Sequence, residues 1–120
     1  MKTLILALFF TLIIISQAHA QSTLTPQEMC AELGKRFVSD IRVQFVSEYH
    51  YNRKLDKCFL KIMYFEKMDA VILANVFESK VIGHYYSEDF MSKPVICSVG
   101  SKECYSWDEF KILIKPYMEE

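Results

Sequence analysis

Beyond residue 20 the chain contains two histidines, His50 and His84, each followed by tyrosine. Both fall near the ends of segments with strand patterning, so converging strands would bring the two imidazoles into one cleft. Two imidazoles beside a cation suffice for acid–base phosphoryl chemistry such as RNA cleavage. Arg53, Lys54 and Lys57 supply cations close to His50. The pattern indicates a small secreted ribonuclease-like hydrolase, although histidines on strand surfaces are more often simply solvated.

The same region also suits binding without catalysis, because tyrosine is favoured at interfaces. Beyond residue 20 there are seven tyrosines, seven phenylalanines and one tryptophan. Four tyrosines would form an exposed patch for another protein or a glycan if they clustered: Tyr49, Tyr51, Tyr85 and Tyr86. The candidate binding residues are His50, Tyr51, Asn52 and Tyr85. Ordinary packing within the sheet is the simpler fate of these rings.

Other chemistries lack their sequence signals. Three glycines are too few for a glycine-rich phosphate loop, and the chain has neither a GxSxG nor a CxxC motif. The spacings of cysteine and histidine match no common zinc signature. We therefore predict no metal and no cofactor.

The charge balance bears on the partners. The first 20 residues hold one of the 14 basic residues and none of the 15 acidic ones, so 13 and 15 remain, a net charge of −2. A general binder of nucleic acid or anionic membrane needs a basic excess. We predict no nucleic-acid partner, and no membrane contact once the N-terminal segment is removed.

The N-terminus has the three parts of a secretory signal peptide. A lysine precedes the apolar run 4–15, and Ala18-His19-Ala20 supplies a small-x-small cleavage site. The run is shorter than the roughly 20 apolar residues that span a membrane, and an uncleaved anchor is the alternative. We expect cleavage after Ala20, with Ala18 as the second choice. The product is a periplasmic or secreted protein with one mature domain over residues 21–120.

Two helices are predicted from their start signals. Thr25, Pro26 and Glu28 provide the cap, first position and capping box of a helix over residues 25–38. Its buried face is predicted to carry Met29, Cys30, Leu33 and Phe37. Ser106 and Glu109 form a second capping box, which opens a C-terminal helix of roughly ten residues. The apolar face of that helix comprises Phe110, Leu113, Ile114 and Tyr117.

Between the helices, alternating and apolar segments predict an antiparallel meander of four to six strands. Residues 41–52 and 57–65 form a hairpin around a polar turn. The second strand presents Cys58, Leu60, Ile62 and Tyr64 on one side. Further strands are predicted at 70–77 and 80–86, followed by a loop over 87–94. Residues 95–105 form a last hairpin, whose Gly100-Ser101 turn suits type II′.

Four cysteines in a small exported domain indicate two disulfides, which three pairings could provide. The layout of the elements favours Cys30–Cys58, because this bond would join the first helix to the second strand. It also favours Cys97–Cys104, which face each other across the last hairpin as a hydrogen-bonded pair, with a strained bond or a bulged turn as alternatives. The loop-entropy model gives these bonds about 3.5 and 2.5 kcal/mol.

Two segments resemble a known group of sequences. They are the HYN…CF pattern at residues 50–59 and the C-x-V-G…C-x-S-x-x-E-F pattern at residues 97–110. Both resemble small exported bacterial proteins of uncharacterised function. The resemblance implies bacterial export and the same arrangement of elements, without an activity, cofactor or catalytic residue. It gives Asn52 a structural role in starting the turn that leads to Cys58.

The sequence thus predicts an α+β domain, with an N-terminal helix, a meander sheet, a C-terminal helix and two disulfides. Its leading functional hypothesis is a binding or interaction module without catalysis, and possible roles of such a module include enzyme inhibition. The alternative is the hydrolase using His50 and His84.

Overall fold

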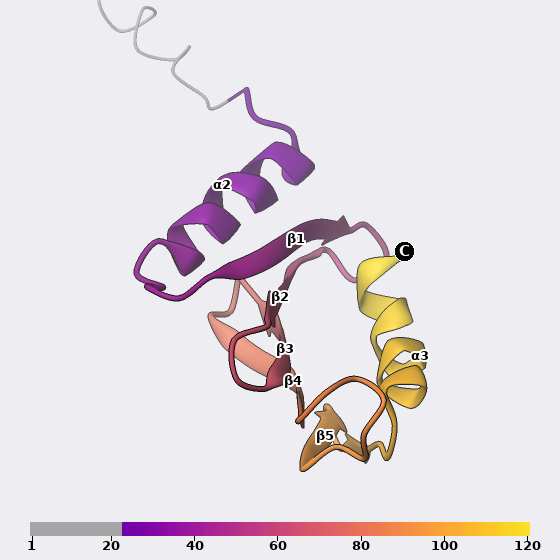
Figure 1. The fold of residues 1–120 in the computed structure, drawn as a ribbon. Helices are drawn as coiled ribbons and strands as arrows, with labels where there is room; N and C mark the ends of the chain where they lie inside the picture. Colours follow the sequence, from indigo (N-terminus) through magenta and orange to yellow (C-terminus); the bar gives the residue numbers. More distant parts are fainter. Residues whose placement is uncertain (1–22) are drawn as a thin grey trace, which may run out of the picture.

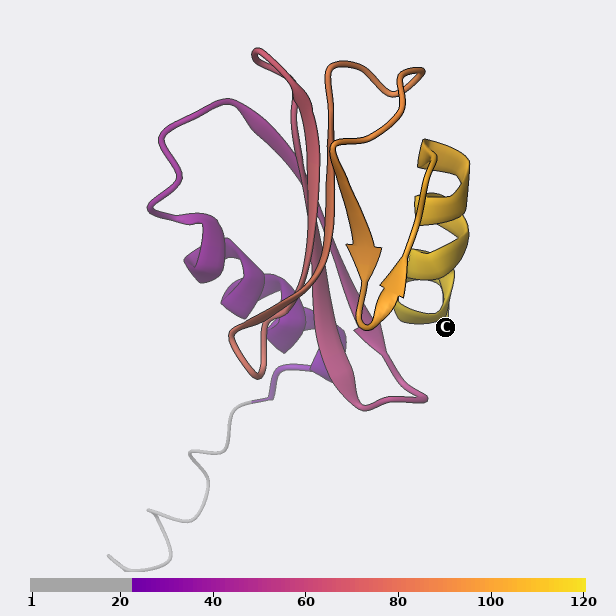
Figure 2. The same ribbon diagram turned by 90° about the horizontal axis from the view of Figure 1, so that it is seen from below.

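The computed structural model describes residues 23–120, and the predicted leader over residues 1–20 lies outside the described residues. The elements are α2 (Pro26–Val38), β1 (Phe45–Asn52), β2 (Lys57–Tyr64), β3 (Asp69–Asn75), β4 (Lys80–Ser87), β5 (Ile96–Val99), β6 (Lys102–Glu103) and α3 (Trp107–Met118). The six strands form one antiparallel sheet in the order β1-β2-β3-β4-β5-β6. Helices α2 and α3 flank opposite faces of this sheet (Figure 1 and Figure 2). The predicted α+β meander between two helices is confirmed.

Helix α2 begins where its capping signals predict. The Thr25 hydroxyl accepts from the Glu28 N–H at 3.2 Å, and the Glu28 carboxylate accepts from the Thr25 N–H at 2.7 Å. These hydrogen bonds, the one from the Thr25 backbone first, lower the pKa of Glu28 below its ordinary value. The buried residues of α2 are Cys30, Gly34 and Val38, spaced four apart on one face. Met29 was expected on this face but is 40% exposed.

Strand β1 starts later than the alternation in the sequence predicts. Residues 41–44 lie in the connection from α2, where the Ile41 N–H still donates to the Val38 carbonyl at 3.1 Å. The first residue of β1, Phe45, pairs with Tyr64, which is the last residue of β2. Earlier residues therefore have no partner strand, and an alternating pattern alone cannot make a ladder.

The sheet buries both of its faces, each against a different helix. Paired residues on neighbouring strands project to the same face. Cys58, Leu60 and Ile62 of β2 pack with Cys30 and Val38 under α2. On the other face, the core under α3 contains Phe59, Val71, Leu73, Tyr85, Phe110, Ile114 and Met118. The prediction that Cys58, Leu60 and Ile62 share a buried side of β2 is thus confirmed. Phe59 is buried on the opposite face, under α3.

The last hairpin turns at Gly100, whose φ of +60° suits the first central position of a type II′ turn. Val99 pairs with Lys102 as predicted. The Cys104 N–H donates to the Cys97 carbonyl at 3.0 Å, which is one of the two hydrogen bonds of the predicted pair.

Helix α3 begins after Ser106, whose hydroxyl accepts from the Glu109 N–H at 3.1 Å. The second half of the predicted capping box is wrong. The Glu109 carboxylate accepts from the Tyr105 N–H at 2.8 Å, one residue before the cap. The apolar face of α3 buries Phe110, Ile114 and Met118, with Leu113 and Tyr117 half-buried beside them.

Both disulfides have the pairing that the layout favours. Cys30–Cys58 joins α2 to β2 with a Cα–Cα distance of 5.3 Å, and Cys97–Cys104 closes the last hairpin with 5.0 Å. All four cysteines of the described chain are therefore paired. The Cys30–Cys58 bond belongs to the core under α2, and the Cys97–Cys104 bond belongs to the core under α3.

Candidate functional site

The two histidines do not share a site, because they project from opposite faces of the sheet. His84 pairs with Ile72, which pairs with Ile62, which pairs with Ser47. Side chains in such a row share one face. Ser47 and His50 are three residues apart on β1, so their side chains point to opposite faces. The geometry required for two imidazoles acting on one substrate is absent from this arrangement.

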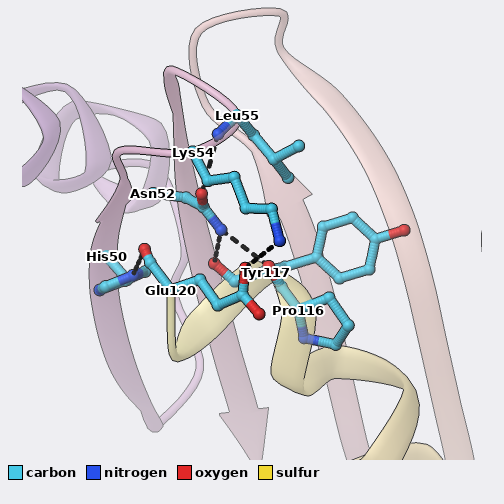
Figure 3. A network of polar contacts seen from close by, with 7 residues as sticks. All are labelled: His50, Asn52, Lys54, Leu55, Pro116, Tyr117 and Glu120. Atoms are coloured by element: carbon cyan, nitrogen blue, oxygen red, sulfur yellow. Dashed lines mark hydrogen bonds and ion pairs between the residues drawn. The ribbon is translucent and has the colours of Figure 1, made fainter.

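His50 belongs to a network of polar contacts between the β1–β2 hairpin and the end of α3 (Figure 3). Its Nε2 atom lies 3.2 Å from the backbone oxygen of Glu120, and the Lys54 ammonium is 2.9 Å from the Glu120 carboxylate. Lys57, the other lysine near His50, is 3.1 Å from Glu78. Both lysines are therefore engaged in ion pairs.

Asn52 is completely buried at the centre of this polar network. Its amide donates to the carbonyl oxygens of Pro116 at 2.7 Å and Tyr117 at 3.1 Å, and its own oxygen accepts from the Leu55 N–H at 3.0 Å. Figure 3 shows these bonds joining the β1–β2 turn to the end of α3. Asn52 starts the turn, as the sequence suggests, but it has no surface to offer a ligand.

Tyr51 also holds the β1–β2 turn, through a hydrogen bond from its hydroxyl to the Asp56 carboxylate. This bond, followed by desolvation, raises the pKa of Tyr51 above its ordinary value. The Tyr51 N–H donates to the Gln27 side chain at 2.8 Å. Tyr51 and His50 do meet at a shallow cleft of about 370 Å³, which Arg53 and the start of α2 complete.

Tyr85 is wholly buried, so it cannot belong to an exposed tyrosine patch. Its ring packs under α3 against three others: Phe90 at 5.8 Å, Trp107 at 5.2 Å and Phe110 at 5.5 Å between centroids. Tyr86 is the next residue on β4 and therefore projects from the opposite face. The alternative of an exposed cluster of four tyrosines is not realised, because alternation along β4 places Tyr85 and Tyr86 on opposite faces, and Tyr85 packs in the core as the simpler interpretation has it.

A different site lies between the loop that follows β4 and the start of α3. This cleft has a volume of about 590 Å³ and is lined by Phe90, Met91, Ser92, Lys93, Tyr105, Ser106, Trp107 and Asp108. Figure 2 shows the loop and the start of α3 at the end of the sheet opposite the β1–β2 turn. A second cleft of about 370 Å³ shares Lys93 and Tyr105 and continues along β5 to β6.

Short-range hydrogen bonds fix the shape of the loop. The Asp89 carboxylate accepts from the N–H groups of Met91 and Ser92, both at 2.8 Å. These two bonds, in that order, lower the pKa of Asp89. The Phe90 N–H donates to the Asp69 carboxylate at 3.0 Å. The Val95 N–H donates to the Tyr86 carbonyl in β4 at 2.7 Å.

The loop presents large apolar side chains to solvent. In the described chain, the four most exposed large apolar residues are Met91 at 96%, Val95 at 72%, Tyr105 at 63% and Ile112 at 63%. Three of these four border the two clefts. We define the tip surface as Met91, Lys93, Val95, Ile96 and Tyr105. The sequence signal for it is an isolated methionine within a polar loop, which is too weak to single out.

The tip surface has a single basic centre. Lys93 lines both clefts and forms no ion pair with any residue from 23 to 120. Within the same range, no three histidine, cysteine or acidic side chains gather as a metal site would require, and no helix is long and apolar enough to cross a membrane. What the tip surface offers is apolar contact around one cation.

Comparison of the chain with protein-family profiles, with curated proteins and with solved structures found no match.

Proposed function

We propose that the protein is an exported, disulfide-stabilised binding module that recognises another protein through its tip surface. The secretory pattern of residues 1–20 supports export, and two disulfides suit an oxidising compartment, either the periplasm or the medium. The domain acts by occupying its partner and not by catalysis.

The observation that carries this proposal is the exposure of Met91, whose side chain is 96% accessible on a loop with a fixed shape. Single exposed apolar residues are common and need no explanation. Here Met91 shares one cleft with Tyr105, and Tyr105 shares the second cleft with Val95 and Ile96. These three neighbours are each more than half exposed. Methionine and tyrosine are enriched at protein interfaces, and a preorganised loop loses little entropy on binding.

The chemistry of the tip surface describes the partner. Met91 is an unbranched side chain that fits an apolar pocket, and Val95, Ile96 and Tyr105 would surround the entrance to that pocket. Lys93 has no acidic partner in the described chain, so an acidic side chain near the pocket would complete the contact. We expect a folded protein that presents an apolar pocket beside a carboxylate.

The test is capture of the partner by the intact mature protein and by a Met91→Glu variant, from the exported fraction of the producing cells under oxidising conditions. Leu55→Glu is the matched control, because Leu55 is 43% exposed in the β1–β2 turn at the opposite end of the sheet. The wild type and Leu55→Glu should retain one stoichiometric protein that Met91→Glu loses. Once the partner has been purified, its affinity for the Met91→Glu variant should be weaker than its affinity for the wild type by about 30-fold or more.

Charge reversal at Lys93 supplies a second arm of the experiment. Lys93→Glu should slow association and reduce its dependence on salt, as expected when an attractive charge pair is removed. A partner that binds Met91→Glu and the wild type equally would contradict the proposed surface. Failure of every variant to retain any protein would contradict the binding function itself.

A further inference from the structure

We propose that Phe90 is a lid over an internal binding position for a small neutral aromatic molecule that carries a carbonyl group. In the open state the ring of this molecule replaces the Phe90 ring, and its carbonyl oxygen accepts a hydrogen bond from the Tyr85 hydroxyl. This site goes beyond the proposed recognition of a protein partner and does not depend on it.

The starting observation is the hydroxyl of Tyr85. This residue has no exposed surface, and its hydroxyl has no hydrogen-bond partner within residues 23–120. Buried hydroxyls are nearly always paired, because an unpaired one has lost its water without compensation. A phenylalanine would fill the same aromatic cluster without this cost in stability. We therefore expect the hydroxyl to have a function that phenylalanine could not supply.

The side chains around Tyr85 explain why its hydroxyl is unpaired. The rings of Phe90, Trp107 and Phe110 lie within 5.8 Å of its ring, measured between centroids. The phenylalanine rings carry no hydrogen-bonding group, and the indole N–H of Trp107, which could donate to the hydroxyl oxygen, makes no such bond. None of the three rings offers an acceptor for the hydroxyl proton. A partner for the hydroxyl must come from outside this cluster.

Phe90 is the one member of the cluster that belongs to neither a helix nor a strand. Its ring stacks on Tyr85 with an interplanar angle of 21° and lies 4.4 Å from Trp107. Phe90 and Trp107 also line the cleft of about 590 Å³. Withdrawal of the Phe90 ring would therefore leave a ring-sized space that opens directly into this cleft.

The shape and polarity of this space define the ligand. A planar ring can stack on Tyr85 and contact Trp107 as Phe90 does. In the proposed complex, a short carbonyl substituent on the stacked ring lies alongside the phenol and accepts from its hydroxyl. The ligand must be neutral, because the surrounding rings offer no group to compensate a buried charge.

The first experiment opens the site with Phe90→Ala and compares two probes of similar size. Acetophenone carries the carbonyl acceptor, and ethylbenzene has the same ring without it. Titration of the full mature protein is followed through its backbone amide NMR signals. We expect Phe90→Ala to bind acetophenone at least tenfold more tightly than the wild type, whose own ring competes. The variant should prefer acetophenone to ethylbenzene by at least fivefold.

The second variant removes only the hydroxyl. Phe90→Ala combined with Tyr85→Phe should still bind ethylbenzene and should lose its preference for acetophenone. If Phe90→Ala binds both probes equally, the Tyr85 hydroxyl makes no bond to the ligand and the proposal is wrong. Absence of binding by a folded Phe90→Ala variant would also overturn it, with the near-ultraviolet dichroism of Trp107 reporting the fold.

A third measurement keeps the proposal testable if Phe90→Ala does not fold. Tyr85→Phe alone removes an unpaired hydroxyl, so its unfolding temperature should equal or exceed that of the wild type. A lower unfolding temperature would show that the hydroxyl already has a partner inside the closed protein, and the reason for a ligand would disappear.

Discussion

The side-chain amide of Asn52 donates a hydrogen bond of 2.7 Å to the carbonyl oxygen of Pro116, 64 residues further along the chain. A second bond of 3.1 Å reaches the carbonyl of Tyr117. Both carbonyls belong to the last turn of α3, where no later helical N–H can reach them. The first hairpin of the sheet therefore caps the C-terminal helix.

This long-range cap makes Asn52 one of the most sensitive positions of the fold. Asn52→Ala would leave two carbonyls and the Leu55 N–H without partners around a buried side chain, at a site that is itself partly buried. We expect a loss of about 2–4 kcal/mol in the free energy of unfolding, because each unpaired buried group costs about 1–3 kcal/mol and some regain water. Urea denaturation at neutral pH measures this change.

Lys54→Ala is the control from the same network. Lys54 and Glu120 are largely exposed, so the loss of their ion pair should cost less than about 1 kcal/mol. If Asn52→Ala were as mild as this control, the cap would not hold α3 in place.

Helix α2 packs tightly against the sheet at Gly34. A Cβ atom added there would lie 2.2 Å from the Cδ1 atom of the Tyr49 ring. Alanine is the better helix former by about 1 kcal/mol, yet Gly34→Ala should destabilise the wild type by about 1–3 kcal/mol through overpacking. Chemical denaturation gives the sign.

A second background separates packing from helix propensity. In a Tyr49→Ala protein the obstacle is gone, and Gly34→Ala should then raise the free energy of unfolding by about 0.5–1 kcal/mol. The reversal of sign is the result to look for. A destabilising effect of equal size in both backgrounds would place the origin elsewhere than in contact with Tyr49.

The two disulfides should contribute unequally, because they close loops of different length. Their sequence separations are 28 residues for Cys30–Cys58 and seven for Cys97–Cys104. Replacing each pair by alanines should cost about 3.5 and 2.5 kcal/mol on the loop-entropy model. Denaturation of the two double variants, each keeping the other bond, measures both values.

Thiol counting checks the premise of this comparison. Alkylation of the denatured protein should modify no cysteine before reduction and four after it, as mass spectrometry can follow. Modification of any cysteine before reduction would mean that the protein is only partly oxidised in its native compartment.

Much of the fold follows from local signals in the sequence. Thr25, Pro26 and Glu28 mark the start of α2 because a capping box is a contact between residues three apart. The Gly100 turn likewise determines that Val99 faces Lys102, and this register brings Cys97 opposite Cys104. Such features need no knowledge of the rest of the chain.

The features that sequence could not predict depend on distant partners. Strand β1 begins at Phe45 because β2 ends at Tyr64, and the alternating residues before Phe45 give no sign of that limit. Tyr85 is buried because α3 covers its face of β4. Four of the five tip-surface residues lie within residues 91–96, but their exposure and their placement near Tyr105 depend on how the loop after β4 lies against the segment before α3, which no pattern along the chain gives.

The loop that carries the tip surface should also respond to acid. The N–H groups of Met91 and then Ser92 stabilise the Asp89 carboxylate, so its pKa lies below the ordinary value of 3.8. A folded-state pKa lower than the unfolded one gives stability that is fully present above the unfolded pKa. This contribution is lost as the pH falls through 3.8 and then through the lower folded value.

Asp89→Asn tests this sign directly, because asparagine keeps an acceptor oxygen but carries no charge. The wild type should be more stable than Asp89→Asn at pH 6, and the difference should shrink steadily as the pH falls below about 4. Urea midpoints of both proteins across this range measure it, with Glu88→Gln as the control for loss of a neighbouring charge. A difference that stays constant down to pH 2.5 would mean that the carboxylate is no better stabilised in the folded loop than in the unfolded chain. The loop would then owe its shape to Phe90 and the aromatic cluster.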